Sequence, residues 1–173
     1  YYDKTDIEVA YPFGYGLSYT TFEISHIDAY SNKKRIYVTC TVTNTGSIAG
    51  KEVVQLYYGA PQGKLGKPAK ELCGFAKTSL LEPGESEDLI ISFVIDDMSS
   101  FDDCGAVALS CFVLEEGTYH FYLGTSVRNA KELEFTYELP ETRIVEQLHS
   151  YCAPEKLDKR MKSDGSYEVL ECK

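Results

Sequence analysis

Regular alternation of apolar and polar residues dominates residues 21–139 and limits what this part of the chain can become. The clearest case is 36–43 (Ile-Tyr-Val-Thr-Cys-Thr-Val-Thr), which has a two-residue period and many β-branched residues. Side chains two positions apart lie on the same face of a strand, and β-branched residues favour strands. Turn signals such as 44–46 (Asn-Thr-Gly) and 82–84 (Glu-Pro-Gly) separate the runs. About seven or eight short strands joined by turns predict an all-β fold, an antiparallel β-sandwich.

The pattern changes at both ends of this region. After Pro140, the apolar residues Ile144, Val145 and Leu148 have a spacing that predicts a short amphipathic C-terminal helix. The chain beyond Glu155 is rich in charge and is typical of a linker. We therefore expect three segments: 1–20 as a linker and aromatic docking segment, 21–139 as the sandwich, and 140–173 as a helix and a linker toward a further domain.

The aromatic strip, residues 11–19 (Tyr-Pro-Phe-Gly-Tyr-Gly-Leu-Ser-Tyr), has four aromatic residues and no charge. Proline and glycine interrupt any regular helix, and so many aromatic rings are costly to leave in water. Two interpretations remain open, packing on its own domain or docking onto a neighbouring domain. The residues that we expect to dock are Tyr11, Pro12, Phe13, Tyr15, Leu17 and Tyr19.

Composition excludes some classes of partner. The 173 residues have a net charge of −10, which disfavours binding to nucleic acid. No apolar run is long enough to span a bilayer, so we expect no membrane partner. The six cysteines have loose spacing without Cys-x-x-Cys, and we expect reduced, structural thiols and a cytoplasmic location. The chain begins at Tyr1 rather than at methionine, which indicates a piece of a longer protein.

A search for catalytic or metal-binding residues finds none that we assign. The acidic stretch 96–103 has the carboxylates for Ca²⁺ but lacks the spacing of an EF-hand, so we expect a solvated loop or a single helical turn. No Gly-x-Ser-x-Gly elbow and no phosphate-binding loop occur, and we expect no cofactor and no metal. Several tyrosines on strand faces could stack on sugar rings, although packing is the commoner role of such residues. They are Tyr57, Tyr58, Tyr119, Tyr122 and Tyr137.

Several motifs in order resemble one known family. The aromatic strip with Thr20-Thr21-Phe22 is similar to the entry segment of the fibronectin type III-like domain of glycoside hydrolase family 3. The similarity continues through later strands and turns, at 42–46, 50–57, 70–77, 81–86, 117–119 and 123–126.

The resemblance implies an immunoglobulin/fibronectin type III-like sandwich that is a non-catalytic accessory domain of a β-glucosidase-like enzyme. Such enzymes retain anomeric configuration with two carboxyl groups, which the family places in a (β/α)₈ barrel and an α/β sandwich. The implied partners are these two domains of the same parent chain, and the implied substrate of the parent is a small saccharide. The unusual segment after Pro140 resembles the variant with reversed domain order, in which the barrel comes last.

Two other functions remain alternatives. A carbohydrate-binding module would use the strand-face tyrosines, and an adhesion sandwich unrelated to hydrolases would also account for the strands. Saturable binding of glucose, cellobiose or longer β-glucans would favour the first alternative.

Overall fold

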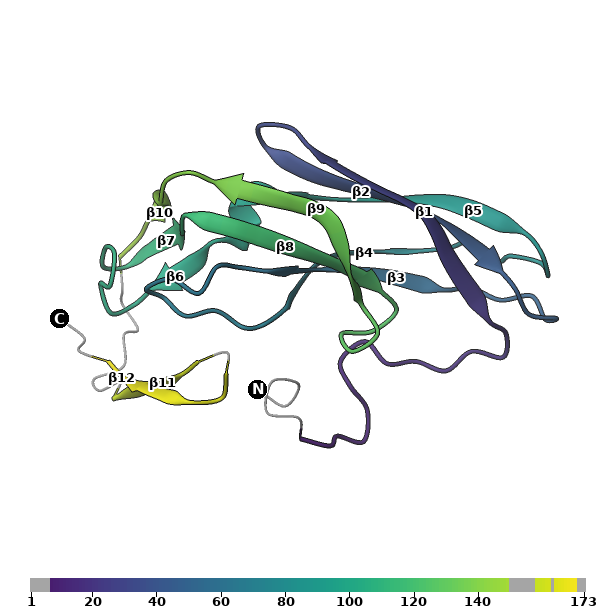
Figure 1. The fold of residues 1–173 in the computed structure, drawn as a ribbon, viewed down its shortest axis with the longest axis horizontal. Coiled ribbons are helices and arrows are strands. Elements are labelled where there is room, and N and C mark those ends of the chain that lie inside the picture. The colour runs from purple at the N-terminus through teal and green to yellow at the C-terminus, as the bar shows by residue number, and fades with distance from the viewer. Residues whose placement is uncertain (1–6, 150–157, 163, 171–173) are drawn as a thin grey trace.

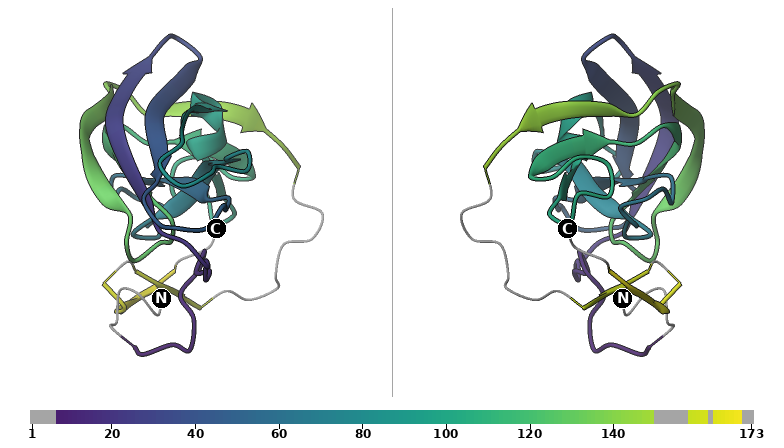
Figure 2. Two further views of the ribbon diagram at one scale, coloured as in Figure 1. Left: turned by 90° about the vertical axis from the view of Figure 1, so that its right-hand side faces the viewer. Right: turned by 90° about the vertical axis from the view of Figure 1, so that its left-hand side faces the viewer.

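The computed structural model describes residues 7–149, 158–162 and 164–170 and contains two antiparallel sheets packed face to face (Figure 1). The three-stranded sheet has the order β1-β2-β5, and the four-stranded sheet has the order β4-β3-β8-β9. The bounds are β1 Phe22–Ser31, β2 Arg35–Asn44, β3 Val53–Gly59, β4 Glu71–Lys77, β5 Ser86–Val94, β8 Gly117–Gly124 and β9 Lys131–Leu139. Figure 2 shows the two layers from either end. The predicted all-β sandwich is confirmed.

The core lies between the two sheets and follows from the alternation in the sequence. Every second residue of β2 is buried, from Ile36 to Asn44. Buried side chains of β2, β3, β5 and β8 form one cluster, in which the ring of Phe93 lies 6.0 Å from the ring of Phe121 in the opposite sheet. Burial of such apolar surface contributes about 25 cal/mol per Å² to folding.

A smaller sheet closes one end of the sandwich and corrects the predicted C-terminal helix. It contains β6 (Ser100–Asp102), β7 (Cys111–Leu114) and β10 (Arg143–Gln147), in the order β10-β7-β6. The prediction of a helix over 141–148 is wrong because these residues include β10, which pairs with β7. An isolated helix of this length is marginal, whereas the open edge of β7 offers hydrogen-bond partners and Val145 packs against the main core.

Two further elements complete the described chain. The 3₁₀ helix η1 (Ile95–Met98) begins the acidic stretch, in agreement with the predicted loop or helical turn. The strands β11 (Lys159–Met161) and β12 (Tyr167–Val169) form a hairpin outside the two layers, shown in yellow in Figures 1 and 2. The predicted linker therefore contains a hairpin, and residues 150–157 lie outside the described part. No helix among the described residues is long and apolar enough to cross a bilayer.

Among the cysteines in the described residues, Cys104 differs from the expectation of reduced thiols. Cys40, Cys73 and Cys111 are free thiols, but Cys104 is disulfide-bonded. Sequence separation could not show this, because a disulfide depends on distance in the folded chain. Burial, with the Asp88 carboxylate in addition, raises the pKa of the Cys40 thiol to about 11, so Cys40 behaves as a small apolar core residue.

Candidate functional site

The aromatic strip lies against the outer face of the four-stranded sheet, in the purple segment before β1 (Figure 1). The carbonyl oxygen of Phe13 accepts a hydrogen bond from the N–H of Val127 at 3.1 Å. The carbonyl oxygen of Gly14 accepts one from Nε2 of Gln55 at 3.1 Å. The rings of Phe13 and Tyr57 meet edge to face with their centroids 6.5 Å apart. The backbone of the strip is therefore fixed to β3 and to the loop after β8.

Gly14 allows this close approach. The N–H of Tyr15 donates to the carbonyl oxygen of Pro12 at 3.0 Å, and Gly14 at the third position of this turn has a φ of +78°. A turn with positive φ at that position strongly favours glycine. A Cβ atom on Gly14 would also lie 2.1 Å from Oε1 of Gln55, so the site excludes a side chain for two reasons.

Asn44 holds the chain where the strip ends, through Thr20, the residue that directly follows it. Its side-chain oxygen accepts hydrogen bonds from the hydroxyl of Thr20 at 2.7 Å and from the N–H of Gly46 at 3.1 Å. Its amide nitrogen donates to the carbonyl oxygens of Ile48 at 2.9 Å and Leu81 at 2.8 Å. The sequence identified this residue only as part of a turn, but the buried amide joins the strip to two loops of the sandwich.

The side chains of the strip are exposed although its backbone is fixed. Leu17 and Tyr19 are 88% and 95% exposed. The rings of Tyr11 and Tyr15 contact each other with centroids 5.3 Å apart, and both remain open to solvent. Of the six residues predicted to dock, only Pro12 is half-buried, and the others are exposed: Tyr11, Phe13, Tyr15, Leu17 and Tyr19. Docking itself stays a prediction at this point.

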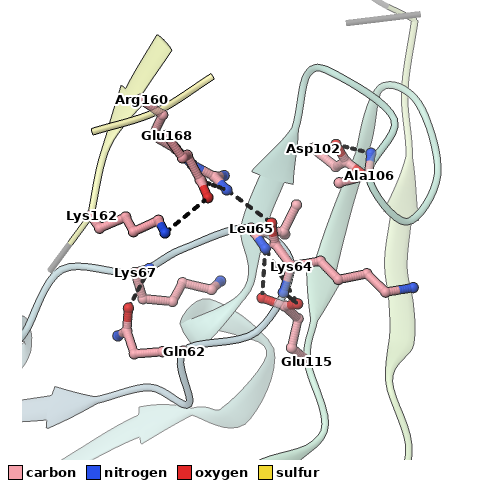
Figure 3. A network of polar contacts seen from close by, with 10 residues as sticks. All are labelled: Gln62, Lys64, Leu65, Lys67, Asp102, Ala106, Glu115, Arg160, Lys162 and Glu168. Carbon is pink, nitrogen blue, oxygen red and sulfur yellow. Dashed lines mark hydrogen bonds and ion pairs between the residues drawn. The ribbon is translucent and has the colours of Figure 1, made fainter. Parts of the chain in front are cut away.

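A second polar region lies at the end of the sandwich nearest the β11–β12 hairpin (Figure 3). The carboxylate of Glu115 accepts hydrogen bonds from the backbone N–H groups of Lys64 at 2.5 Å and Leu65 at 3.4 Å. The glycines and lysines of 62–68 are typical of an exposed loop, but Leu65 and Lys67 are only 5% and 2% exposed, so that expectation is wrong for both. The partner that orders this loop is 51 positions away in the chain, beyond the reach of a local pattern.

The hairpin is attached to this loop through Arg160. Its guanidinium group donates to the carbonyl oxygen of Lys64 at 2.8 Å and pairs with the carboxylate of Glu168 (Figure 3). Burial lowers the pKa of Lys67, while the carboxylates of Glu115 and Glu71 oppose that change. Among the described residues, the ammonium group of Lys67 has no hydrogen-bond partner. The network serves to order the loop and the hairpin.

Asp102 is the most constrained carboxylate of the acidic stretch. It is 1% exposed, and its two oxygens accept hydrogen bonds from four backbone N–H groups at 2.7–3.0 Å. These donors belong to Gly105, Ala106, Val107 and Ala108. Burial opposes ionisation, but the four donors together lower the pKa of Asp102 below its ordinary value. Within the described residues, no group of three His, Cys, Asp or Glu side chains could hold a metal ion.

We expect Asp102→Asn to lower the free energy of unfolding at pH 7 by about 1–3 kcal/mol, because an amide oxygen cannot accept all four donors. The unfolded carboxyl binds its proton near pH 3.8, whereas the folded one stays ionised to lower pH. Its contribution to stability is therefore present above pH 3.8 and is lost as the pH falls through the folded pKa. Urea unfolding between pH 7 and pH 3 should show a steeper acid loss in the parent chain than in the variant. Asp103→Asn, at an exposed neighbour, is the control, and an equal effect there would contradict the assignment.

The strand-face tyrosines pack within the protein. Tyr57 is 1% exposed and Tyr119 is fully buried, with its hydroxyl donating to the carbonyl oxygen of Glu115 at 2.8 Å. Burial raises the pKa values of Tyr58 and Tyr119. Tyr122 is half-buried, with the ammonium group of Lys70 4.4 Å from its ring centroid. These positions leave no flat row of free rings for stacking on sugars.

Comparison with known proteins agrees with the sandwich fold described above. A family model described as "Fibronectin type III-like domain" matches residues 52–127. The chain carries a fibronectin type III-like domain. It is 51% identical over 179 residues to beta-glucosidase A of Butyrivibrio fibrisolvens, which covers 94% of this chain and 21% of that protein.

Solved structures agree with the sequence relatives. A beta-glucosidase from Paenibacillus barengoltzii matches with a TM-score of 0.82 and 44% identity, over 98% of this chain and 20% of that one. A GH3 beta-glucosidase from Bifidobacterium adolescentis matches with a TM-score of 0.69 and 31% identity, over 80% of this chain and 20% of that one. The chain, including its fibronectin type III-like domain, thus spans about a fifth of these relatives. The resemblance to this domain of family 3 β-glucosidases is confirmed.

Proposed function

We propose that the chain is the non-catalytic accessory part of a family 3 β-glucosidase and that its aromatic strip docks onto a neighbouring domain of the same protein. The observation that carries the proposal is the contrast within the strip. Its backbone is fixed at Phe13 and Gly14, and the hydroxyl of Thr20 holds the chain directly after it, while its large apolar side chains point into solvent. Exposed apolar groups of this extent mark interaction sites in soluble proteins.

The relatives support a neighbour that belongs to the same protein. Other domains of the same chain make up about four fifths of the β-glucosidases that this chain matches. We infer that an α/β sandwich and a (β/α)₈ barrel flank this part in the parent protein, in the reversed order with the barrel last. The two carboxyl groups of a retaining glycosidase would belong to those domains, and a small saccharide would be the substrate of the parent.

A chimera tests the docking. The matching segment of beta-glucosidase A from Butyrivibrio fibrisolvens is replaced by this chain, and thermal unfolding and hydrolysis of an aryl-glucoside are measured. We expect Leu17→Ser and Tyr19→Ser to lower the unfolding midpoint and the activity of the chimera. The same variants of the isolated chain should change its unfolding free energy by less than about 0.5 kcal/mol, because the two side chains are exposed there.

Two controls define the result. Ile90→Ser changes a residue that is 59% exposed on the three-stranded sheet, away from the strip, and should have no effect on either protein. The isolated chain should hydrolyse no aryl-glucoside. Strip variants that leave the chimera unchanged, or turnover by the isolated chain that a point change abolishes, would contradict the proposed function.

A further inference from the structure

Strand β4 places two large apolar side chains on the same outer face as the aromatic strip. Phe75 is 68% exposed and Leu72 is 39% exposed. The sequence assigned both to a strand of the sandwich without separating them from its core. Residues three positions apart normally point to opposite faces of a strand, so their shared exposure needs a structural cause.

The cause is a bulge in the pairing of β3 with β4. Gln55 pairs with Phe75 and Leu56 with Gly74, but the next residue, Tyr57, pairs with Leu72, so that Cys73 is skipped. Such a bulge re-aims the side chains on one side of it. Here the bulge places the side chain of Leu72 on the outer face of the sheet, the same face on which Phe75 lies.

Gly74 shows that the inward side of β4 is filled. A Cβ atom on Gly74 would lie 2.6 Å from Cγ2 of Ile91 in the opposite sheet. Cys73 also packs partly against the main core. The bulge therefore gives the core small residues and gives the surface the two large ones.

The strip lies next to this pair. Gly14 contacts the side chain of Gln55, whose direct cross-strand partner is Phe75. The ring of Phe13 contacts Tyr57, whose partner is Leu72. Cross-strand partners on one face have Cβ atoms about 4.5–5.5 Å apart. The strip therefore covers Gln55 and Tyr57, and the exposed pair of β4 lies directly beside them on the same outer face.

We propose that Phe75 and Leu72 extend the docking surface and that the domain that receives the strip also covers β4. This inference rests on the proposed function. The occupant is a neighbouring domain of the same protein rather than a sugar or a second copy, because the surface continues the strip and other domains fill about four fifths of the relatives. The surface that this domain presents to the strip and to the β4 pair is apolar with few charges, because the strip and the β4 pair offer no ionised group.

The test uses the same chimera and the isolated chain. We expect Phe75→Ser to lower the unfolding midpoint of the chimera and to leave that of the isolated chain unchanged. Hydroxyl-radical labelling should modify Phe75 severalfold more slowly in the chimera than in the isolated chain. Ile90 is the matched control, because it is similarly exposed on the other sheet. Ile90→Ser should leave both unfolding midpoints unchanged. In the unsubstituted proteins, Ile90 should be labelled equally in the chimera and in the isolated chain.

Combination with the strip distinguishes the two proposals. If one domain covers both parts, Phe75→Ser and Leu17→Ser together should cost the chimera less than the sum of the single changes. Suppose that Leu17→Ser lowers the unfolding midpoint of the chimera, but Phe75→Ser does not and Phe75 is labelled equally in both proteins. That result overturns this inference and leaves the proposed function intact. An absence of effect from both overturns both. An equal loss in the isolated chain would assign Phe75 to the stability of the sandwich and would also overturn the inference.

Discussion

Replacing Phe121 with alanine is expected to lower the free energy of unfolding of this chain by about 3–5 kcal/mol, the usual cost of removing a buried aromatic ring. The ring is fully buried in β8. Its centroid lies 6.0 Å from that of Phe93 in the opposite sheet and 5.5 Å from that of Phe135 in β9. The change would leave a cavity where the two layers meet. Urea unfolding of the isolated chain, followed by tyrosine fluorescence, measures the loss.

Phe75→Ala is the matched control for this prediction. The residue type is the same, but the side chain is 68% exposed, so the expected change is within about 0.5 kcal/mol. Similar losses at the two positions would mean that the arrangement of inward and outward faces described for β4 and β8 is wrong.

Asn44→Ala is expected to lower the free energy of unfolding by about 2–4 kcal/mol, because a buried amide with four hydrogen bonds is lost and some of its partners are left unsatisfied. The carbonyl oxygen of Ile48 loses its donor from Asn44, that of Leu81 keeps only the N–H of Gly50, and the N–H of Gly46 loses its acceptor. The hydroxyl of Thr20 is also released, so the end of the strip should loosen. Hydrogen exchange at Gly46 should accelerate together with the loss of stability.

Thr43→Ala provides a comparison one residue away. Its hydroxyl contacts the hydroxyl of Ser86 at 2.8 Å on an exposed face. We expect a change within about 0.5 kcal/mol there. A loss at Asn44 no greater than this would show that its buried hydrogen bonds do not hold the strip to the sandwich.

The sandwich was predictable because its strands follow local rules. Strand β2 covers Arg35–Asn44, and the alternating run 36–43 predicted it closely. The turn at 82–84 was also predictable, since Gly84 has a φ of +82°, a conformation that glycine adopts readily. Strand β9 ends at Leu139, while the division of the chain into three segments stays a prediction.

Long-range contacts explain what the sequence did not reveal. The segment Arg143–Gln147 became a strand because β7 had an open edge, a fact that no local spacing contains. Loop residues Leu65 and Lys67 are buried because Glu115 lies under the loop. A local pattern records propensities, and it cannot record which distant group will satisfy a backbone N–H.

The candidate site was predictable in part. The strip was visible from its composition, but the β4 pair was not, because a bulge at Cys73 decides which face Leu72 occupies. The alternative of a carbohydrate-binding module finds no support, since Tyr57, Tyr58 and Tyr119 are buried. An adhesion sandwich does not account for the β-glucosidase relatives. The cytoplasmic location stays a prediction.

The anchored backbone of the strip has a consequence for the thermodynamics of association. A flexible segment must lose about 1–2 kcal/mol of conformational entropy per residue when it becomes ordered on a partner. In this protein part of that loss has already occurred during folding, through the contacts of Phe13 and Gly14 in the strip and of Thr20 directly after it. Docking then restricts mainly the side-chain rotamers of the strip. Because the backbone is already ordered, a modest contact area can give a tight and well-oriented interface between the two domains.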